Sequence, residues 1–242
     1  MERIVYDRMA ALDQQHWWYR ARRQVLAALI TRRALPPPDA QILEIGCGTG
    51  HNLPMLGQFG RVEAVEVDPA ARALAEQRLG RAIRSAPLPE IGDLPERHFD
   101  LVGSFDVIEH IEDDEAALAS IARLLKPGGR FVMTVPAHQW MWSAHDVVNH
   151  HKRRYSKTGL TRLIAGSSMR LEAVGYFNSL LFPVAVAARL AGKLRGTDQS
   201  DDSLPPAPLN RALEAVFAQE ARLIGRVALP PGLSLFAVAA AT

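Results

Sequence analysis

Two carboxylates and an imidazole lie close together in the segment Asp106-Val107-Ile108-Glu109-His110, which directly follows the apolar run 99–105. An imidazole titrates near neutral pH, so His110 at the end of a buried strand is a candidate general base. The alternative interpretation is a structural histidine that caps the next helix. Asp106, Glu109 and His110 also offer the ligand types that divalent cations take, which makes them a candidate metal set.

A second group of histidines follows, with His138, His145, His150 and His151 inside 14 residues. Their spacing matches no common structural zinc pattern and no cysteine lies among them, so we favour a substrate-facing loop. Asp106 and His145 are the other catalytic candidates. The expected substrate contacts are the apolar walls Trp140 and Trp142 and the polar side chains His145, Asp146, Arg153, Arg154 and Tyr155. The paired arginines would bind a phosphate or carboxylate, or else form a solvated basic face.

A glycine-rich loop follows the apolar residues 42–45, with glycines alternating at Gly46, Gly48 and Gly50. Without a Cβ on these residues, the backbone can lie directly against a ligand. A helix predicted to begin near Asn52 would aim its free N–H groups at the same space. A dinucleotide fingerprint requires glycine at the position of His51, so the loop indicates another nucleotide-like ligand.

A carboxylate stands 20 positions beyond Gly46, at Glu66, near the end of the alternating pattern 61–68. In nucleoside-binding α/β folds, an acid at this place accepts hydrogen bonds from the ribose hydroxyls. Asp68 is the alternative, although Asp68-Pro69 also fits the cap and first residue of a helix over 70–79. A third interpretation is two surface acids at a strand end.

The elements that must position these residues alternate between strand and helix patterns. Strands are predicted at 42–45, 61–68, 82–85, 99–105, 130–135, 171–177 and 233–239, and helices at 70–79, 114–125 and 157–167. This order predicts an α/β fold, a doubly wound Rossmann-like parallel sheet with helices on both faces. Ligands bind at the carboxyl ends of such strands, where all of the candidate groups above would converge.

Two helical segments flank this core. Residues 1–38 are aromatic and basic, include His16-Trp17-Trp18-Tyr19, and end at a proline triplet, which predicts an N-terminal helical lid. This segment would either pack its aromatic side chains on the domain or cover the bound ligand, and the sequence is consistent with both. Residues 178–229 form a predicted helical insertion with helices at 180–194 and 210–227 and a soft linker at 196–208. The central domain comprises 39–177 and 230–242.

Composition excludes several classes of protein. Among 242 residues, 48% are hydrophobic and 22% are charged, and the net charge of +2 is spread along the chain, so nucleic-acid binding is not expected. A single cysteine and the lack of a secretory segment predict a cytoplasmic protein. We expect it to be a monomer or a homodimer. The uncharged stretch 174–188 is too short to span a bilayer. The portion of this stretch that lies in the insertion, 180–188, favours a hydrophobic or lipid-linked substrate, or peripheral contact with a membrane. An equally good interpretation is that it completes the core or a dimer interface.

Four segments in sequence resemble the class I S-adenosylmethionine-dependent methyltransferases over about residues 40–177. They are Glu44-x-Gly46-x-Gly48-x-Gly50, Glu66, Phe99-Asp100-Leu101-Val102 leading to Asp106–His110, and Leu125-Lys126-Pro127-Gly128-Gly129. The resemblance implies a seven-stranded sheet whose seventh strand runs antiparallel between the fifth and sixth. It also implies methyl transfer from S-adenosylmethionine to a small-molecule acceptor, which we expect at oxygen. The alternative is a non-catalytic subunit that binds S-adenosylmethionine.

The resemblance also implies roles for individual residues. Glu44 and Gly46 would lie beside the methionine part of the cofactor, Glu66 would hold the ribose, and the adenine would rest near Val67 and the Ser85-Ala86 turn. The other implied cofactor contacts are Cys47, Gly48, Gly50, Phe105, Asp106 and Val107. Asp106-x-x-Glu109-His110 is similar to the Glu-x-x-Glu-His segment of the ubiquinone-biosynthesis O-methyltransferases, which can hold a divalent metal near a phenolic substrate. The first residue here is one methylene shorter.

Overall fold

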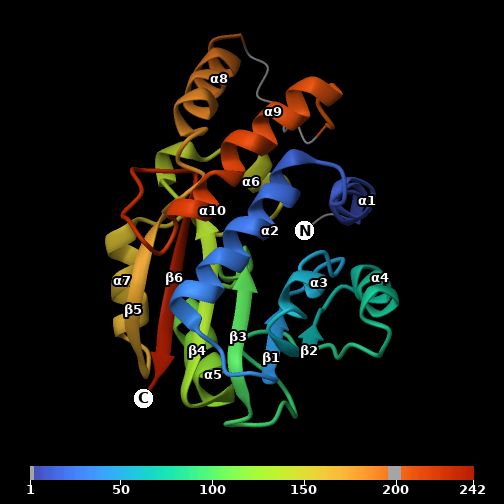
Figure 1. Ribbon diagram of the computed structural model, residues 1–242, viewed down its shortest axis with the longest axis vertical. Helices are drawn as coiled ribbons and strands as arrows, with labels where there is room; N and C mark the ends of the chain where they lie inside the picture. Colours follow the sequence, from blue (N-terminus) through green and yellow to red (C-terminus); the bar gives the residue numbers. More distant parts are fainter. Residues whose placement is uncertain (1–2, 196–202) are drawn as a thin grey trace.

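The computed structural model describes residues 3–195 and 203–242 of the chain. Its centre is a six-stranded sheet in the order β2-β1-β3-β4-β6-β5 (Figure 1). The strands are β1 (Ala40–Ile45), β2 (Gly60–Val65), β3 (Phe99–Phe105), β4 (Leu125–Pro136), β5 (Met169–Phe177) and β6 (Ser234–Ala241). The first four are parallel, and β6 runs antiparallel to both β4 and β5. The predicted place and direction of the last strand are therefore confirmed.

The register of the parallel strands brings the predicted site residues to one level. Ile45 pairs with Val65 on one side and with Ser104 on the other. The next residues along these strands are Gly46, Glu66 and Phe105, so the glycine loop, the ribose candidate and the Asp106 segment all begin at the same edge of the sheet. This is the arrangement that the alternating strand and helix patterns predicted.

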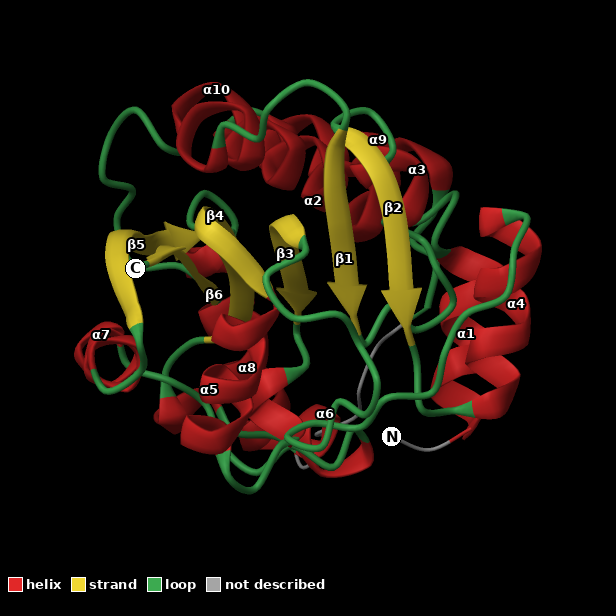
Figure 2. Cartoon of the chain, turned by 90° about the horizontal axis from the view of Figure 1, so that it is seen from below, coloured by secondary structure: helices red, strands yellow, loops and turns green. Residues whose placement is uncertain are grey.

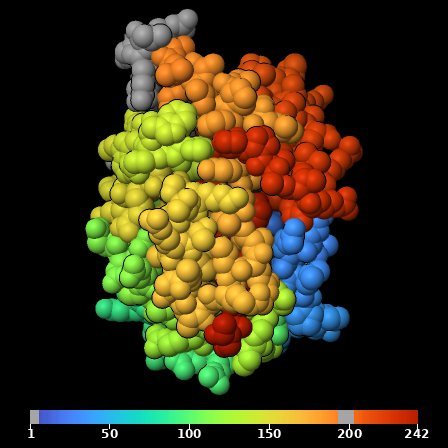
Figure 3. Space-filling view, turned by 90° about the vertical axis from the view of Figure 1, so that its left-hand side faces the viewer, coloured from blue at the N-terminus to red at the C-terminus, as the bar shows by residue number. Residues whose placement is uncertain are grey.

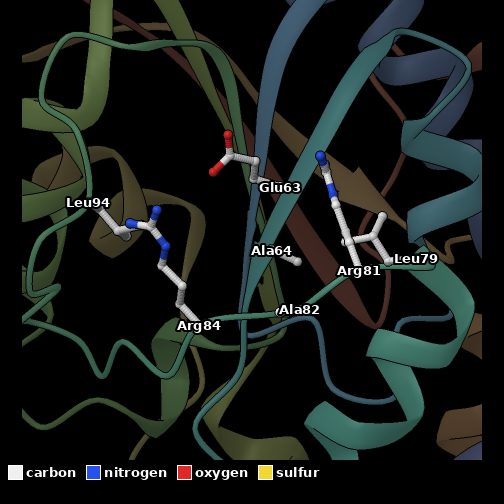
Figure 4. A pocket seen from close by; sticks show the side chains of 7 residues that line it. All are labelled: Glu63, Ala64, Leu79, Arg81, Ala82, Arg84 and Leu94. Atoms are coloured by element: carbon white, nitrogen blue, oxygen red, sulfur yellow. The ribbon is translucent and has the colours of Figure 1, made fainter.

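The predicted strand over 82–85 is not formed among the described residues. Only Arg84 pairs there, through a single bridge to Val65, so the sheet has six strands rather than seven. Pro87 and Pro89 follow closely, and a proline has no N–H to donate to a strand ladder. A hollow of about 130 Å³ remains at this edge, and Figure 4 shows Arg81 and Arg84 on either side of it. None of the predicted site residues lines this hollow.

Helices cover both faces of the sheet, as predicted (Figure 2). One face carries α2 (Trp17–Leu29), α3 (Leu53–Leu56), α9 (Ala207–Ala218) and α10 (Glu220–Leu223), and the other carries α5 (Asp114–Leu124) and α7 (Lys157–Ala165). The helical spacing of Ala117, Leu118, Ile121 and Leu124 in α5 puts all four side chains in the core, each fully buried. α5 ends before Lys126-Pro127-Gly128-Gly129, where the sequence places its stop.

The segment before the sheet and the insertion differ in detail from the prediction. The N-terminal segment breaks between α1 (Arg3–Leu12) and α2, and α1 lies beside α4 (Pro69–Leu79) (Figures 1 and 2). The predicted helix 210–227 is two helices, α9 and α10. Figure 3 shows α8 (Phe182–Arg195, orange) and the α9–α10 region (red) at one end of the molecule. Residues 196–202 of the predicted linker lie outside the described residues. No described helix has the length and apolar character that a membrane crossing requires.

Candidate active site

A cavity of about 540 Å³ lies at the carboxyl ends of the parallel strands. The glycine loop and the end of β2 form one side of it, the segment after β3 forms the middle, and α1 and α2 cover it. The far side comes from the loop after β4 and from the insertion. Predicted site residues that line the cavity are Gly46, Cys47, Gly48, Glu66, Val67, Phe105, Asp106, Val107, Glu109, His110, His145 and Arg154.

The glycine loop is packed tightly against the segment after β3. The N–H groups of Gly46 and Cys47 donate to the carbonyl of Val65 at 2.9 and 3.1 Å, which turns the chain sharply at the end of β1. Gly46 has φ +68°, and a Cβ added there would lie 2.6 Å from a methyl carbon of Val107. Glycine is therefore required at 46 both by the backbone conformation and by the space.

Glu66 is held in place by backbone donors. Its carboxylate accepts hydrogen bonds from the N–H of Gly48 at 2.7 Å and from the N–H of Asp68 at 2.9 Å. Burial raises its pKa, and these donors oppose that effect. Asp68 instead caps α4, accepting from the N–H groups of Ala70 and Ala71 at 2.9 and 2.8 Å. Of the two acids, Glu66 faces the cavity.

Glu44 lies behind the cavity wall rather than in it. Its carboxylate is buried and accepts a hydrogen bond from the Asn52 carboxamide at 2.9 Å, while Asn52 itself lines the cavity. Burial raises the pKa of Glu44 to about 8. His51, the residue that breaks the dinucleotide fingerprint, also lines the cavity, and burial holds its pKa well below the usual value.

Arg22 of α2 reaches into the centre of the cavity, and sequence reasoning missed it. Its guanidinium, only 2% exposed, donates at 2.7 Å to both the Asp106 carboxylate and the Thr134 hydroxyl. It also lies 4.9 Å from the centre of the Trp18 ring, within the range of a cation–π contact. Asp106, whose φ is +59°, therefore forms an ion pair with Arg22 of α2.

The other two members of the predicted metal set lie beside His151. Single ligand atoms of Glu109, His110 and His151 all fall within 4.8 Å of one another, and Asp106 is not in this group. The Glu109 carboxylate is fully buried, and neither oxygen has a hydrogen-bond partner. Burial, reinforced by the charge of Asp106, raises the pKa of Glu109 well above its usual value. An unpaired buried carboxylate beside two imidazoles fits a divalent cation.

His110 is held as a neutral imidazole. Burial and the nearby His151, whose ring centre is 4.7 Å away, lower the pKa of His110 to about 4. His151 in turn contacts the buried Asp146 carboxylate through its Nδ1 at 2.9 Å. Arg154 donates to both oxygens of the same carboxylate at 2.7 and 3.0 Å. These contacts hold the pKa of Asp146 well below its usual range although burial alone would raise it.

Residues 17–173 match the protein family described as a methyltransferase domain. The chain belongs to this methyltransferase family. It is 29% identical over 172 residues to a probable S-adenosylmethionine-dependent methyltransferase of Mycolicibacterium smegmatis, across 69% of this chain and 65% of that protein. A corresponding protein of Mycobacterium tuberculosis is 32% identical over 168 residues, across 67% and 58%. The chain thus spans less than two thirds of the length of these relatives.

Two further similar proteins align over a larger share of this chain and of their own length. A ubiquinone biosynthesis O-methyltransferase of Xanthomonas axonopodis pv. citri is 27% identical over 212 residues, across 77% of this chain and 88% of that protein. The solved complex of a Haloferax volcanii methyltransferase activator with a methyltransferase contains a similar fold. It has a TM-score of 0.61 at 17% identity and covers 98% of this chain and 97% of that one. At this identity the likeness establishes the fold alone.

Several predicted site residues of the chain lie outside the lining of its cavity. Gly50 packs against α4, where an added Cβ would lie 2.9 Å from the Ala75 backbone. The Tyr155 hydroxyl donates to Asp114 at 2.7 Å and does not face the cavity. The lining also omits Glu44, Ser85, Ala86, Trp140 and Trp142. Residues that the cavity adds to the prediction include Tyr6, Met9, Arg22, Asn149, His151 and Asn178.

Proposed function

We propose that this methyltransferase binds S-adenosylmethionine between the glycine loop and Glu66 and transfers its methyl group to an oxygen of a small-molecule acceptor. The observation that supports this most directly is the single continuous cavity. It joins the Gly46–Gly48 loop and Glu66 to the group formed by Glu109, His110 and His151. A donor at one end and a nucleophile at the other would meet in the middle, beside Asp106 and Val107.

The chemistry in this proposal needs mainly alignment, because the sulfonium is already a good leaving group. The acceptor oxygen attacks the methyl carbon, the carbon–sulfur bond breaks, and S-adenosylhomocysteine leaves with the electron pair. The acceptor's proton passes to His110, which is neutral at physiological pH because of its lowered pKa. A base this weak suits proton transfer concerted with methyl transfer, when the acceptor oxygen becomes acidic.

Glu109, His110 and His151 are the residues that would hold a divalent cation in this site. A bound cation would occupy the lone pair with which His110 otherwise accepts the proton. It would instead lower the pKa of an acceptor hydroxyl and favour its anionic form. Calorimetric titration of the purified protein with Mg²⁺ and with Zn²⁺ tests this without an activity assay. We expect binding to the parent and a loss of at least tenfold in affinity for Glu109→Gln. Equal affinity of the two proteins would remove the cation from the proposal.

An apolar or lipid-linked acceptor is supported by side chains beside the far end of the cavity. Trp140 and Val147 are 57% and 62% exposed, and Val184 and Leu190 of α8 are 61% and 55% exposed. The two regions are adjacent, since the Trp140 and Phe182 rings lie 6.2 Å apart, and Arg189 of α8 lines the cavity. We propose that this surface receives the acceptor's apolar part at or near a membrane.

The central test combines binding and turnover. We expect S-adenosylhomocysteine to bind the parent, and labelled methyl to pass from S-adenosylmethionine to members of a panel of phenols, catechols and quinols. His110→Asn should leave binding nearly unchanged and reduce turnover roughly a hundredfold or more. His150→Asn is the matched control, because His150 is exposed and does not line the cavity. Binding with no turnover on any acceptor would favour the non-catalytic alternative.

The apolar surface is tested separately by vesicle pelleting. We expect the parent to sediment with vesicles of mixed phosphatidylethanolamine and phosphatidylglycerol, and Val184→Asp to reduce sedimentation. Leu209→Asp is the control, since Leu209 is 51% exposed on α9 rather than on α8. If the parent remains in the supernatant, the membrane part of the proposal is wrong, whereas the methyl-transfer part stands on the preceding test.

A further inference from the structure

Asp13 lies at the junction of α1 and α2, beneath the surface, and its side chain is fully buried. One oxygen of its carboxylate accepts from an Nη of Arg78 at 2.7 Å and lies 3.4 Å from the Thr49 hydroxyl. The other oxygen is buried and has no hydrogen-bond partner. Its backbone carbonyl accepts both Nη groups of Arg23 at 3.0 Å. Asp13 therefore contacts α2, the glycine loop and the last turn of α4 at once.

Two of the segments that meet at Asp13, α2 and the glycine loop, line the cofactor half of the cavity. The third, α4, begins three residues after Glu66, at Pro69. α1 covers the same region from outside. Its Met9 sulfur would lie 3.5 Å from a Cβ at Gly48, and burial, together with the charge of Glu66, raises the pKa of the Tyr6 hydroxyl. Moving α1 would therefore open the space beside Gly48 and Glu66.

α2 has separate anchors on the insertion. The Trp17 N–H donates to the Asn210 carboxamide at 2.9 Å, and Arg20 forms an ion pair with Glu214 at 2.9 Å. These contacts hold α2 against α9 and lie away from the cofactor half. Asp13 is placed differently, because it ties the end of α1 to the loop and helix beneath it. The two sets of contacts can be removed independently.

We infer that Asp13 and Arg78 are positioning residues that hold α1 closed over the bound donor and so set how long the cofactor stays. The inference rests on the proposed binding of S-adenosylmethionine at the glycine loop. Removing Arg78 leaves the fully buried Asp13 carboxylate without its ion-pair partner, and removing the charge of Asp13 leaves the partly buried Arg78 unpaired. Breaking such a pair from one side costs more than the pair contributes when intact. α1 would then open more often, and the dissociation rate of the ligand would rise while its association rate changed little.

The test uses the full chain and S-adenosylhomocysteine as the probe, followed by stopped-flow tryptophan fluorescence, since Trp18 lines the cavity. We expect Asp13→Asn and Arg78→Gln each to raise the dissociation rate roughly tenfold, a typical size for coupling between sites. The double variant should resemble either single one. Arg78→Lys, which keeps the charge, should restore most of the parent behaviour. Arg20→Gln, which removes an ion pair on the outer side of α2, is the matched control and should dissociate like the parent.

A second measurement needs no ligand. Arg8 lies within α1, so trypsin cleavage after Arg8 requires this helix to open. Without ligand, we expect Asp13→Asn and Arg78→Gln to be cleaved severalfold faster than Arg20→Gln, an increase larger than any fall in their urea midpoints for the whole fold would account for. Equal cleavage of all variants would overturn the inference, as would additive effects in the double variant. Failure of the parent to bind S-adenosylhomocysteine would instead overturn the proposed cofactor, and the cleavage rates would still decide the role of Asp13.

Discussion

Gly46 is the residue at which a single added methyl group should do most harm. An alanine there would adopt φ near +68° and place its Cβ 2.6 and 3.0 Å from the two methyl carbons of Val107. The left-handed backbone costs a residue with a Cβ about 1–2 kcal/mol. Forcing a methyl group into a filled space costs about 1–3 kcal/mol more. We therefore expect Gly46→Ala to lower the free energy of unfolding by about 2–5 kcal/mol.

The two contributions can be separated with variants of the same chain. Gly80 has φ +72° at the end of α4, and an added Cβ meets nothing within 4 Å. Gly80→Ala should therefore show the backbone cost alone. Val107→Ala removes both of the methyl carbons that the new Cβ would strike and leaves only the Val107 Cβ, at 3.4 Å. Combined with Gly46→Ala, it should relieve the steric part and leave the backbone part.

Urea unfolding of the parent and the four variants measures these terms, and S-adenosylhomocysteine titration shows whether the loop still binds. We expect Gly46→Ala to cost more than Gly80→Ala, and the Gly46→Ala cost to shrink by about 1–3 kcal/mol when Val107→Ala is present in both members of the comparison. If Gly46→Ala costs no more than Gly80→Ala, or if Val107→Ala gives no relief, the tight contact between the loop and the segment after β3 is not what requires glycine.

Three other substitutions test separate parts of the site. Glu66→Gln should weaken S-adenosylhomocysteine binding by about 1–3 kcal/mol, which calorimetry measures. Asp68→Ala should lower the free energy of unfolding by about 1 kcal/mol and leave the affinity nearly unchanged, which thermal unfolding and calorimetry show. The reverse pattern would exchange the roles of these two acids. Glu44 has a pKa of about 8 in the folded protein against a usual value of 4.5, so its ionisation lowers the free energy of unfolding progressively as pH rises from 4.5 to 8. The free energy of unfolding of Glu44→Gln should therefore match that of the parent near pH 5 and exceed it at pH 8.5. The same difference between the two proteins at both pH values, measured by urea unfolding, would contradict this. Glu220 is fully buried and accepts three backbone N–H groups at 2.6–2.8 Å, so Glu220→Gln should lower the free energy of unfolding by roughly 2 kcal/mol or more, and an unchanged urea midpoint would show that these bonds contribute little.

The parts of this protein that sequence could predict are those with local signals. The alternating glycines, the acid 20 positions later and the periodic apolar faces each depend on neighbours in the chain, and they placed β1, β2, β3 and α5 nearly as observed. The strand predicted at 82–85 does not form because its few residues of β propensity stand directly before a proline-rich turn. The single bridge at Arg84 does not require a strand.

The contacts that assemble the far half of the cavity carry no local signal. Arg22 and Asp106 are 84 positions apart, and nothing in either neighbourhood specifies the other. In the sequence, His151 is only one of several closely spaced histidines. Its placement beside Glu109 depends on a backbone hydrogen bond from Lys152 to the Glu109 carbonyl at 2.8 Å, which sequence spacing does not reveal. Apolar periodicity is also absent from the loop after β4, so the outward position of Trp140 could not be predicted.

The position of β6 bears on the order in which the chain can fold during synthesis. This strand follows β4 and β5 in the sequence, yet it lies between them and pairs with both. Until residues 234–241 emerge from the ribosome, β4 has an open edge and β5 has no place in the sheet. An open strand edge is a site at which nascent chains associate with one another. The yield of correctly folded protein therefore depends on how long the edge of β4 stays unpaired before β6 is synthesised. Selection can therefore act on the rate at which the insertion is translated.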